Sequence, residues 1–235
     1  MALPGEGFIA LWNDVVPNRE DYGAWHTREH VPQRMTVEGF LRAFRYVLIA
    51  GTLPQYFTLY ALRELAALKS SAYLQLVDEP TPWSRHMRPD MRNFIRRICR
   101  TGVTLGGGVG GFAAVGLSTS DDFRSAASVC ASLSTMDGVS GTHFGAVDPV
   151  APPFNVGVQP GLLPFEPRGL FVVEGYDEDK LTESCARATA LVPQTLQAWS
   201  FYKLAFELRK DDLADLKVSL PAQLDPSIHS RGPSQ

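Results

Sequence analysis

"GFIALWND", residues 7–14, is the stretch that decides the fold, because its pattern returns later in the chain as "GFAAVGLS" at residues 111–118. Both read as strands that begin with Gly and run through apolar residues. Two more pairs match in the same order: "VEGFLRAFRYV" with "MDGVSGTHFGAV", and "YFTLYALRELAALKSSAY" with "LFVVEGYDEDKLTESCAR". The partners stand roughly 105 residues apart, which indicates an internal duplication.

Each half shows the same succession of strand and helix signals. In the first half, strands are predicted at 7–14, 40–49, 55–62 and around 93–101, and helices at 18–30 and 63–76. In the second half, strands are predicted at 111–118, 138–148, 169–176 and 197–208, and helices at 121–136 and 177–191. This β-α-β-β-α-β order is that of a ferredoxin-like unit.

A four-stranded sheet with helices on one face leaves its other face bare. Two such sheets can bury their bare faces against each other. We therefore predict an α+β fold in which tandem ferredoxin-like repeats form an intrachain, pseudo-dimeric α+β barrel. We also expect the sheets to close around a dry cavity.

The predicted first repeat spans residues 1–105 and the second spans 112–212. Between them, "GGGVGG" at 106–111 does not open a dinucleotide-binding βαβ unit and lacks the lysine of a phosphate loop, so we interpret it as a junction. A proline-rich loop is predicted at 78–90. Residues 213–235 are predicted to be a disordered tail, because "PAQLDPSIHSRGPSQ" lacks apolar periodicity.

The composition is that of an ordinary globular protein: 235 residues, 45% of them hydrophobic and 20% charged. A net charge of -3 gives no basic field for nucleic acid or an anionic membrane. No apolar run approaches the ~20 residues of a membrane span, and the N-terminus lacks signal-peptide features. The widely spaced cysteines Cys99, Cys130 and Cys185 predict reduced thiols and a cytoplasmic location.

"WHTREHVP", residues 25–32, ends the first predicted helix. Pro32 lacks a backbone donor and disfavours helical geometry at the residue before it, so we expect regular helix to end near His30. At about 100° per residue, one broad stripe of this helix carries two aromatic and three ionisable side chains. The stripe consists of Tyr22, Trp25, His26, Glu29 and His30. It is typical of a helix edge that reaches into a pocket.

Three interpretations of this stripe remain open. The aromatic residues can be core anchors, with His30 favoured by the dipole at a helix end. Alternatively, Glu29 and His30 can supply acid-base chemistry near neutral pH, where imidazole titrates. Finally, His26, Glu29 and His30 have the H-x-x-E-H order of inverted zinc peptidases, but those need a third protein ligand and a larger chain. We expect no bound metal.

"W-x-x-x-E-H-V-P-Q-R-M" followed by "G-F-L-R-A-F-R-Y" resembles the EthD-like branch of the dimeric α+β barrel superfamily. The segment "SSAYLQL…PTPW" is also similar to bacterial relatives with two fused units. The resemblance covers roughly the first 100 residues. The matching positions are Trp25, Glu29, His30, Pro32, Gly39, Phe40, Arg45 and Tyr46. His26 lies outside the pattern, and Phe44 stands where many relatives carry a second Arg.

The resemblance implies a pocket between the sheet and its helices, and a small, largely apolar, often aromatic substrate. Members of the superfamily include cofactor-free polyketide cyclases, lactone isomerases and quinone-forming monooxygenases, together with haem-dependent chlorite dismutases. Histidines and tyrosines often act there as acids and bases. One fold carries many reactions, so the resemblance does not choose among them.

Strand alternation supplies the remaining candidates. Arg42 and Tyr46 share one face of a predicted strand, and Arg45 lies on the other. An arginine on a covered face needs an anionic partner, either a carboxylate such as Asp14 or a substrate. Asp14 is expected at a barrel mouth or in a turn.

Small residues flank His143, which leaves room for a bound molecule or for a role as an axial haem ligand. The histidine of the proline-rich loop, His86, is expected at the surface.

We therefore expect a cofactor-independent acid-base enzyme, a lyase, isomerase or cyclase, acting on a small cyclic or aromatic-pathway metabolite. In this scheme His30 moves the proton, Glu29 orients the imidazole, and Arg45 with Tyr46 stabilises an enolate. The expected substrate-binding residues are Asp14, Tyr22, Trp25, His26, Arg42 and His143.

Two alternatives to this function remain. One is a cofactor-free or haem-dependent oxygenase, and the other is a non-catalytic binding protein for a hydrophobic small molecule. The expected partners are a small-molecule substrate, with neither nucleic acid nor membrane, and a homodimer is one option.

Overall fold

The computed structural model describes residues 3–16, 19–149, 157–192 and 194–214. The strands of the first repeat are β1 (Gly7–Val15), β2 (Phe40–Ala50), β3 (Tyr56–Leu62) and β4 (Met91–Gly106). Its helical segments are α1 (Arg19–Trp25), η1 (His26–His30), α2 (Val31–Thr36), η2 (Leu65–Lys69), α3 (Ser71–Asp78), α4 (Pro82–Met87) and η3 (Arg88–Asp90).

The second repeat follows the same plan with fewer helical segments. Its strands are β5 (Phe112–Ser118), β6 (Val139–Val147), β7 (Gly169–Gly175) and β8 (Leu196–Arg209). Its helices are α5 (Phe123–Ser134) and α6 (Glu178–Leu191), and the short turn η4 (Asp211–Ala214) follows β8. Residues 215–235, most of the segment expected to be a tail, lie outside the described part of the chain.

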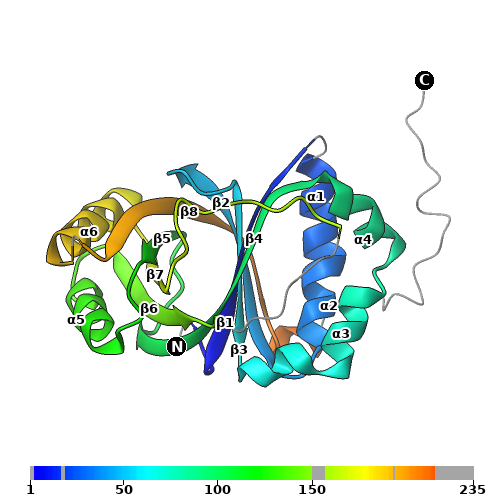
Figure 1. Cartoon of the computed structure of the whole chain (residues 1–235), viewed down its shortest axis with the longest axis horizontal. Helices are drawn as coiled ribbons and strands as arrows, with labels where there is room; N and C mark the ends of the chain where they lie inside the picture. Colours follow the sequence, from blue (N-terminus) through cyan, green and yellow to red (C-terminus); the bar gives the residue numbers. More distant parts are fainter. Residues whose placement is uncertain (1–2, 17–18, 150–156, 193, 215–235) are drawn as a thin grey trace.

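The strands form one closed antiparallel barrel in the order β1-β3-β2-β8-β5-β7-β6-β4. The two repeats meet where β2 pairs with β8 and where β4 pairs with β6. Helices α1 to α4 cover the first-repeat side, and α5 and α6 cover the opposite side (Figure 1). The predicted α+β barrel within one chain is therefore confirmed.

The barrel interior is filled by side chains from both repeats. Large aromatic residues dominate it, among them Phe8, Trp12, Phe44, Phe57 and Tyr202. Side chains fill the inside of a barrel of this size, so the expected dry cavity between the sheets is wrong. Further apolar clusters lie outside the barrel, including one between each half of the sheet and its helices.

The first helix continues beyond His30, where sequence reasoning ended it. Residues His26–His30 form a π-helical turn, in which the Val31 amide donates to the His26 carbonyl, five residues back. α2 then starts with Pro32 in its first turn. A wider turn removes the need for the amide that proline lacks, so the chain stays helical to Thr36.

The proline-rich segment 78–90, expected to be a loop, contains the helix α4. Thr81 caps this helix by accepting from the Ser84 amide, and Pro82 occupies the first turn, where its missing donor costs nothing. The predicted helix at 63–76 is divided into η2 and α3 at Ser70. Of these short helices, α3 contributes Tyr73 to the lining of a cavity outside the barrel.

Candidate functional site

A cavity of about 50 Å³ lies between the first-repeat sheet and its helices, and we call it the first-repeat pocket. Apolar and aromatic side chains form most of its wall: Ile9, Leu11, Trp25, Phe40, Tyr60, Tyr73, Met91, Phe94 and Val158. The remaining lining residues are His30, Arg34, Arg88 and Arg96. The pocket is on the outside of the barrel, and His30 is a wall residue of it.

His30 ends the π-helical turn, and its ring packs against two neighbouring rings. Its centroid lies 4.5 Å from that of Trp25 and 5.3 Å from that of His26. Trp25 is held in turn, because its indole N–H donates to Glu29 Oε1 and to Ser84 Oγ, at 3.2 Å in each case. Within the described part of the chain, the His30 imidazole has no hydrogen-bond partner, so a ligand can engage it.

Burial holds the pKa of His30 well below its usual value, and the neighbouring Arg34, His26 and Arg88 lower that pKa further. The imidazole is therefore neutral at physiological pH. A neutral imidazole beside bound substrate can accept a proton, which is the function of a general base.

Three arginines from separate segments face this pocket. Arg34 comes from α2, Arg88 from η3 and Arg96 from β4. Arg88 donates to the Val77 carbonyl at 3.0 Å, which fixes its position. No lining residue in the described part of the chain is an aspartate or glutamate. The pocket therefore combines apolar walls with a positive electrostatic potential.

Glu29 is buried next to the pocket but does not contact His30 through a hydrogen bond. Its Oε1 accepts from Thr81 at 2.5 Å and from Ser84 and Trp25 at 3.2 Å. The carboxylate thus ties α4 to the first helix. Its expected role, orienting the His30 imidazole, finds no support in this geometry.

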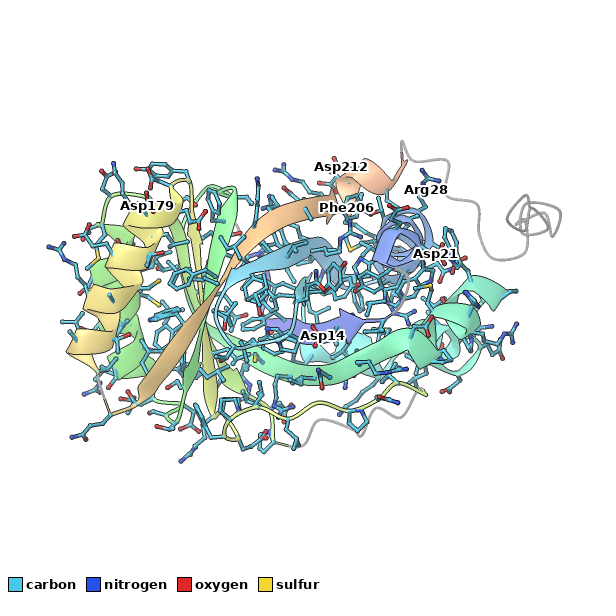
Figure 2. The ribbon with its side chains drawn as sticks, turned by 90° about the horizontal axis from the view of Figure 1, so that it is seen from above. Asp14, Asp21, Arg28, Asp179, Phe206 and Asp212 are labelled. Carbon is cyan, nitrogen blue, oxygen red and sulfur yellow. The ribbon has the colours of Figure 1, made fainter. Side chains whose placement is uncertain are left out.

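Arg45 and Tyr46 lie on opposite faces of β2, because consecutive strand residues alternate. Arg45 is on the helix side, where it donates to the Gly23 carbonyl at 3.1 Å and lies 5.7 Å from the Phe206 ring. The strand residue Phe206 lies beside η4 (Figure 2). Tyr46 points into the barrel. The expected pairing of both residues around one enolate does not occur.

The other residues expected to bind substrate also lie in different parts of the structure. Tyr22 donates to Asn13 Oδ1 at 3.1 Å, and His26 Nε2 lies 3.4 Å from Thr58 Oγ1, so both belong to the packing behind the pocket. Asp14 is a strand residue of β1, and its carboxylate accepts from the Gln55 amide and from the Asn93 side chain, at 2.7 Å in each case. Of the expected site residues, only Trp25 and His30 line the first-repeat pocket.

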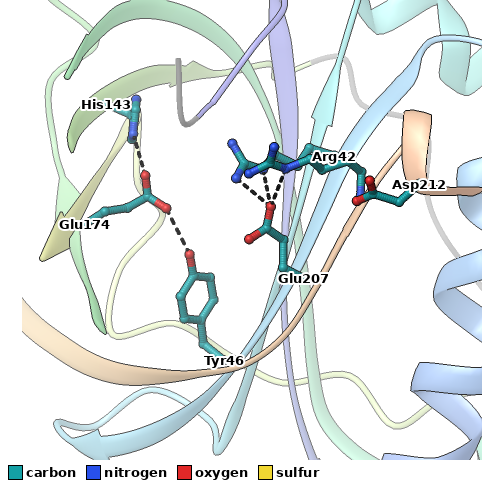
Figure 3. Close-up of polar contacts among 7 residues, drawn as sticks. Arg42, Tyr46, His143, Glu174, Glu207 and Asp212 are labelled. Atoms are coloured by element: carbon teal, nitrogen blue, oxygen red, sulfur yellow. Dashed lines mark hydrogen bonds and ion pairs between the residues drawn. The ribbon is translucent and has the colours of Figure 1, made fainter. Parts of the chain in front are cut away.

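A second polar group lies inside the barrel (Figure 3). Glu174 accepts from the Tyr46 hydroxyl at 3.1 Å and pairs with His143 Nε2 at 3.2 Å. Burial and the Glu174 charge raise the pKa of Tyr46, so its hydroxyl stays protonated and donates. Nearby, Arg42 forms an ion pair with Glu207 at 2.5 Å. These contacts join strands of both repeats.

Sequence reasoning missed Glu174 and the pocket residues Arg34, Tyr60, Tyr73, Arg88 and Arg96. Arg34 follows His30 by four residues, one helical turn. It would have been found if the helix had been extended past Pro32. The other pocket residues come from separate elements, and no local pattern connects them.

No protein-family model and no curated protein matches the chain. Solved structures do match. An anthrone oxidase-like protein has a TM-score of 0.57 and 9% identity, covering 94% of this chain and 99% of that one. A protein provisionally named a monooxygenase, from Fusobacterium nucleatum, has a TM-score of 0.56 and 10% identity, with coverages of 88% and 95%. One provisionally named a chlorite dismutase has a TM-score of 0.52 and 8% identity, with coverages of 89% and 98%.

At such identities the likeness establishes the fold, a barrel of the dimeric α+β type. The predicted function, a cofactor-independent lyase, isomerase or cyclase, is wrong on this comparison. The neighbours are named as oxidase-like, monooxygenase and chlorite dismutase proteins, which favours the oxygenase alternative.

Haem does not fit the residues at hand. His143, the expected axial ligand, faces the barrel interior, and its two ring nitrogens contact Thr104 and Glu174, each at 3.2 Å. The layer between the second-repeat sheet and its helices is packed with apolar side chains. The first-repeat pocket, at about 50 Å³, is far smaller than the macrocycle.

The described residues include no group of three or more His, Cys, Asp or Glu side chains arranged to hold a metal ion. In the same part of the chain, every helix is too short or too polar to cross a bilayer.

Proposed function

We propose that the chain is an oxidoreductase of the oxidase or monooxygenase type, which oxidises a small apolar molecule with O2 in the first-repeat pocket. The observation that carries this proposal is the geometry at His30, a neutral, unpartnered imidazole in an apolar cavity edged with arginines. The names of the structural neighbours support the class of reaction.

In the proposed reaction, His30 accepts a proton from an activated C–H group of the substrate. The arginines stabilise the resulting carbanion or enolate, and such stabilisation typically makes the largest contribution to catalysis. The electron-rich anion then reduces O2. For a methylene group the balance is CH2 + O2 → C=O + H2O, so the carbon supplies all the electrons that O2 accepts, and no external reductant is needed.

The family branch, the boundaries of the two repeats and the oligomeric state belong to the same proposal. We infer that the first repeat, residues 1–105, is an EthD-like unit and carries the site. The junction at 106–111 and the second repeat at 112–212 complete the barrel, and a homodimer in solution is part of the proposal.

Oxygen uptake tests this function directly. The purified chain would be supplied with anthrone and other compounds that carry an activated methylene, and O2 consumption would be followed with an electrode. We expect His30→Gln to lower turnover by at least ~100-fold. Activity should be constant above neutral pH and fall in acid, where His30 becomes protonated, since only the neutral imidazole accepts a proton.

The matched control is His86→Gln, because His86 is exposed on α4 and lies outside the pocket lining. This variant should retain wild-type turnover. If the wild type consumes no O2 with any compound, or if His30→Gln and wild type turn over equally, the proposal fails.

A further inference from the structure

We propose that the first-repeat pocket recognises an organic carboxylate, with Arg34 and Tyr60 holding the carboxylate oxygens and the apolar wall holding the rest of the molecule. This inference deepens the proposed function, in that it takes the pocket to be the substrate site. It concerns binding, which can be measured without turnover.

The first argument is the charge on Arg34. The residue is 6% exposed, yet no carboxylate in the described part of the chain lies within ion-pairing distance of it. Its contacts are a long hydrogen bond from Nη2 to the Leu76 carbonyl, 3.5 Å, and the face of the Tyr73 ring, 5.7 Å away. A buried cation without an anion is costly, and a bound carboxylate would remove that cost.

The second, independent argument is the hydroxyl of Tyr60. The side chain is 1% exposed and lines the pocket, and its oxygen has no hydrogen-bond partner among the described residues. Burial raises the pKa of Tyr60, so the hydroxyl keeps its proton. A buried hydroxyl is rarely left unpaired, which points to a missing acceptor.

The surroundings strengthen both arguments. Arg88 and Arg96 add positive charge at the same wall. Inside the barrel, by contrast, Arg42 has its own carboxylate partner in Glu207. The barrel arginine is thus neutralised by the protein, whereas Arg34 is left for a ligand.

The small size of the cavity favours a planar carboxylate over the larger, tetrahedral phosphate. A guanidinium is planar and can donate two parallel hydrogen bonds to the two oxygens of a carboxylate. One hydroxyl donor, from Tyr60, completes a small set of donors. The cavity of about 50 Å³ matches the size of the carboxylate group itself, and Phe40 and Phe94 lie in the same lining, where the apolar body of the ligand would pack.

The test uses benzoate as the probe, benzamide as its neutral match and phenyl phosphate as the competing anion. Binding to the full chain would be measured by isothermal titration calorimetry. We expect benzoate to bind and benzamide to bind at least ~10-fold more weakly, since a hydrogen bond to a charged group is worth a factor of about ten or more. Arg34→Met should weaken benzoate binding by at least ~10-fold, and Tyr60→Phe by several-fold.

Arg28→Gln is the matched control, because Arg28 is exposed and points away from the barrel, on the η1 turn that precedes α2 (Figure 2). This variant should bind benzoate as the wild type does. Should Arg34→Met fail to fold, Tyr60→Phe removes a single oxygen and still tests the site.

Equal affinity for benzoate and benzamide, or benzoate binding that survives both pocket variants, would overturn the inference. Tighter binding of phenyl phosphate than of benzoate would also overturn it. If benzoate binds as expected and no compound supports O2 uptake, this inference stands and the proposed function fails. If neutral substrates are oxidised at rates that Arg34→Met leaves unchanged, oxidation in the pocket stands and this inference about the carboxylate fails.

Discussion

The two repeats follow one plan, but the layer between sheet and helices holds a cavity of about 50 Å³ in the first repeat and one of only about 10 Å³ in the second. In the second repeat, α5 and α6 bury mainly small or apolar residues against the sheet: Ala126, Val129, Cys130, Leu133, Leu181, Cys185 and Ala188. In the first repeat, the interrupted first helix buries four polar side chains in addition to its apolar ones: His26, Glu29, Gln33 and Arg34. Uninterrupted apolar helices pack closely, whereas buried polar groups need partners and space.

Under the proposed function, the second repeat serves stability while the first carries the chemistry. The barrel needs both sheets to bury its interior, so neither copy can be lost. The candidate site is in the helical layer of the first repeat, which holds the larger of these two cavities.

The largest effect on stability is expected in the layer between the sheet and the helices of the second repeat. Leu133 is fully buried on α5, so Leu133→Ala should lower the free energy of unfolding by about 2–5 kcal/mol. Leu11 borders the pocket and is only partly buried, so Leu11→Ala should cost less than about 2 kcal/mol. Urea unfolding measures both. Equal losses would show that the two layers are packed alike.

A smaller effect on stability distinguishes a tyrosine inside the barrel, Tyr46, from a tyrosine of the pocket, Tyr60. Tyr46→Phe removes the donor to Glu174 and should destabilise the chain by about 1–3 kcal/mol. Tyr60→Phe removes a hydroxyl without a partner, so stability should change by less than about 0.5 kcal/mol or rise. Unfolding curves without ligand give the comparison, and a large loss in Tyr60→Phe would mean that its hydroxyl is already paired in the protein.

The last comparison concerns pH. Burial lowers the pKa of His26 and of His30 in the folded chain, so below about pH 6.5 the unfolded chain binds more protons. Stability should therefore fall as pH falls from 6.5 to 5, by at most about 1.4 kcal/mol per pH unit for each histidine.

The His30→Gln variant should lose one histidine's share of that slope, and unfolding measured at several pH values would reveal it. An unchanged slope would mean that the fold does not lower the pKa of the His30 imidazole, which would contradict the neutral base proposed for the pocket.

Much of the fold follows from local patterns. "GFIALWND" and "GFAAVGLS" predict β1 and β5 because alternating or continuous apolar runs are strand signals. The residues of the candidate site could be predicted from local patterns only in part. Trp25 and His30 were predicted because both belong to the motif "WHTREHVP", which places them on one stripe of a helix. The predicted end of that helix near His30 excluded Arg34, because a π-helical turn that accommodates proline has no sequence signal of its own.

By itself, the sequence determined the strand and helix succession, the duplication and the barrel, since each depends on periodicity within short segments. It also placed Arg45 and Tyr46 on opposite faces, because strand residues alternate. Only the tertiary structure decided which side of the sheet holds the pocket and which arginine lacks a carboxylate. Those facts depend on packing and register between distant segments, where α2, η3, β3 and β4 meet, and local periodicity carries no information about such contacts.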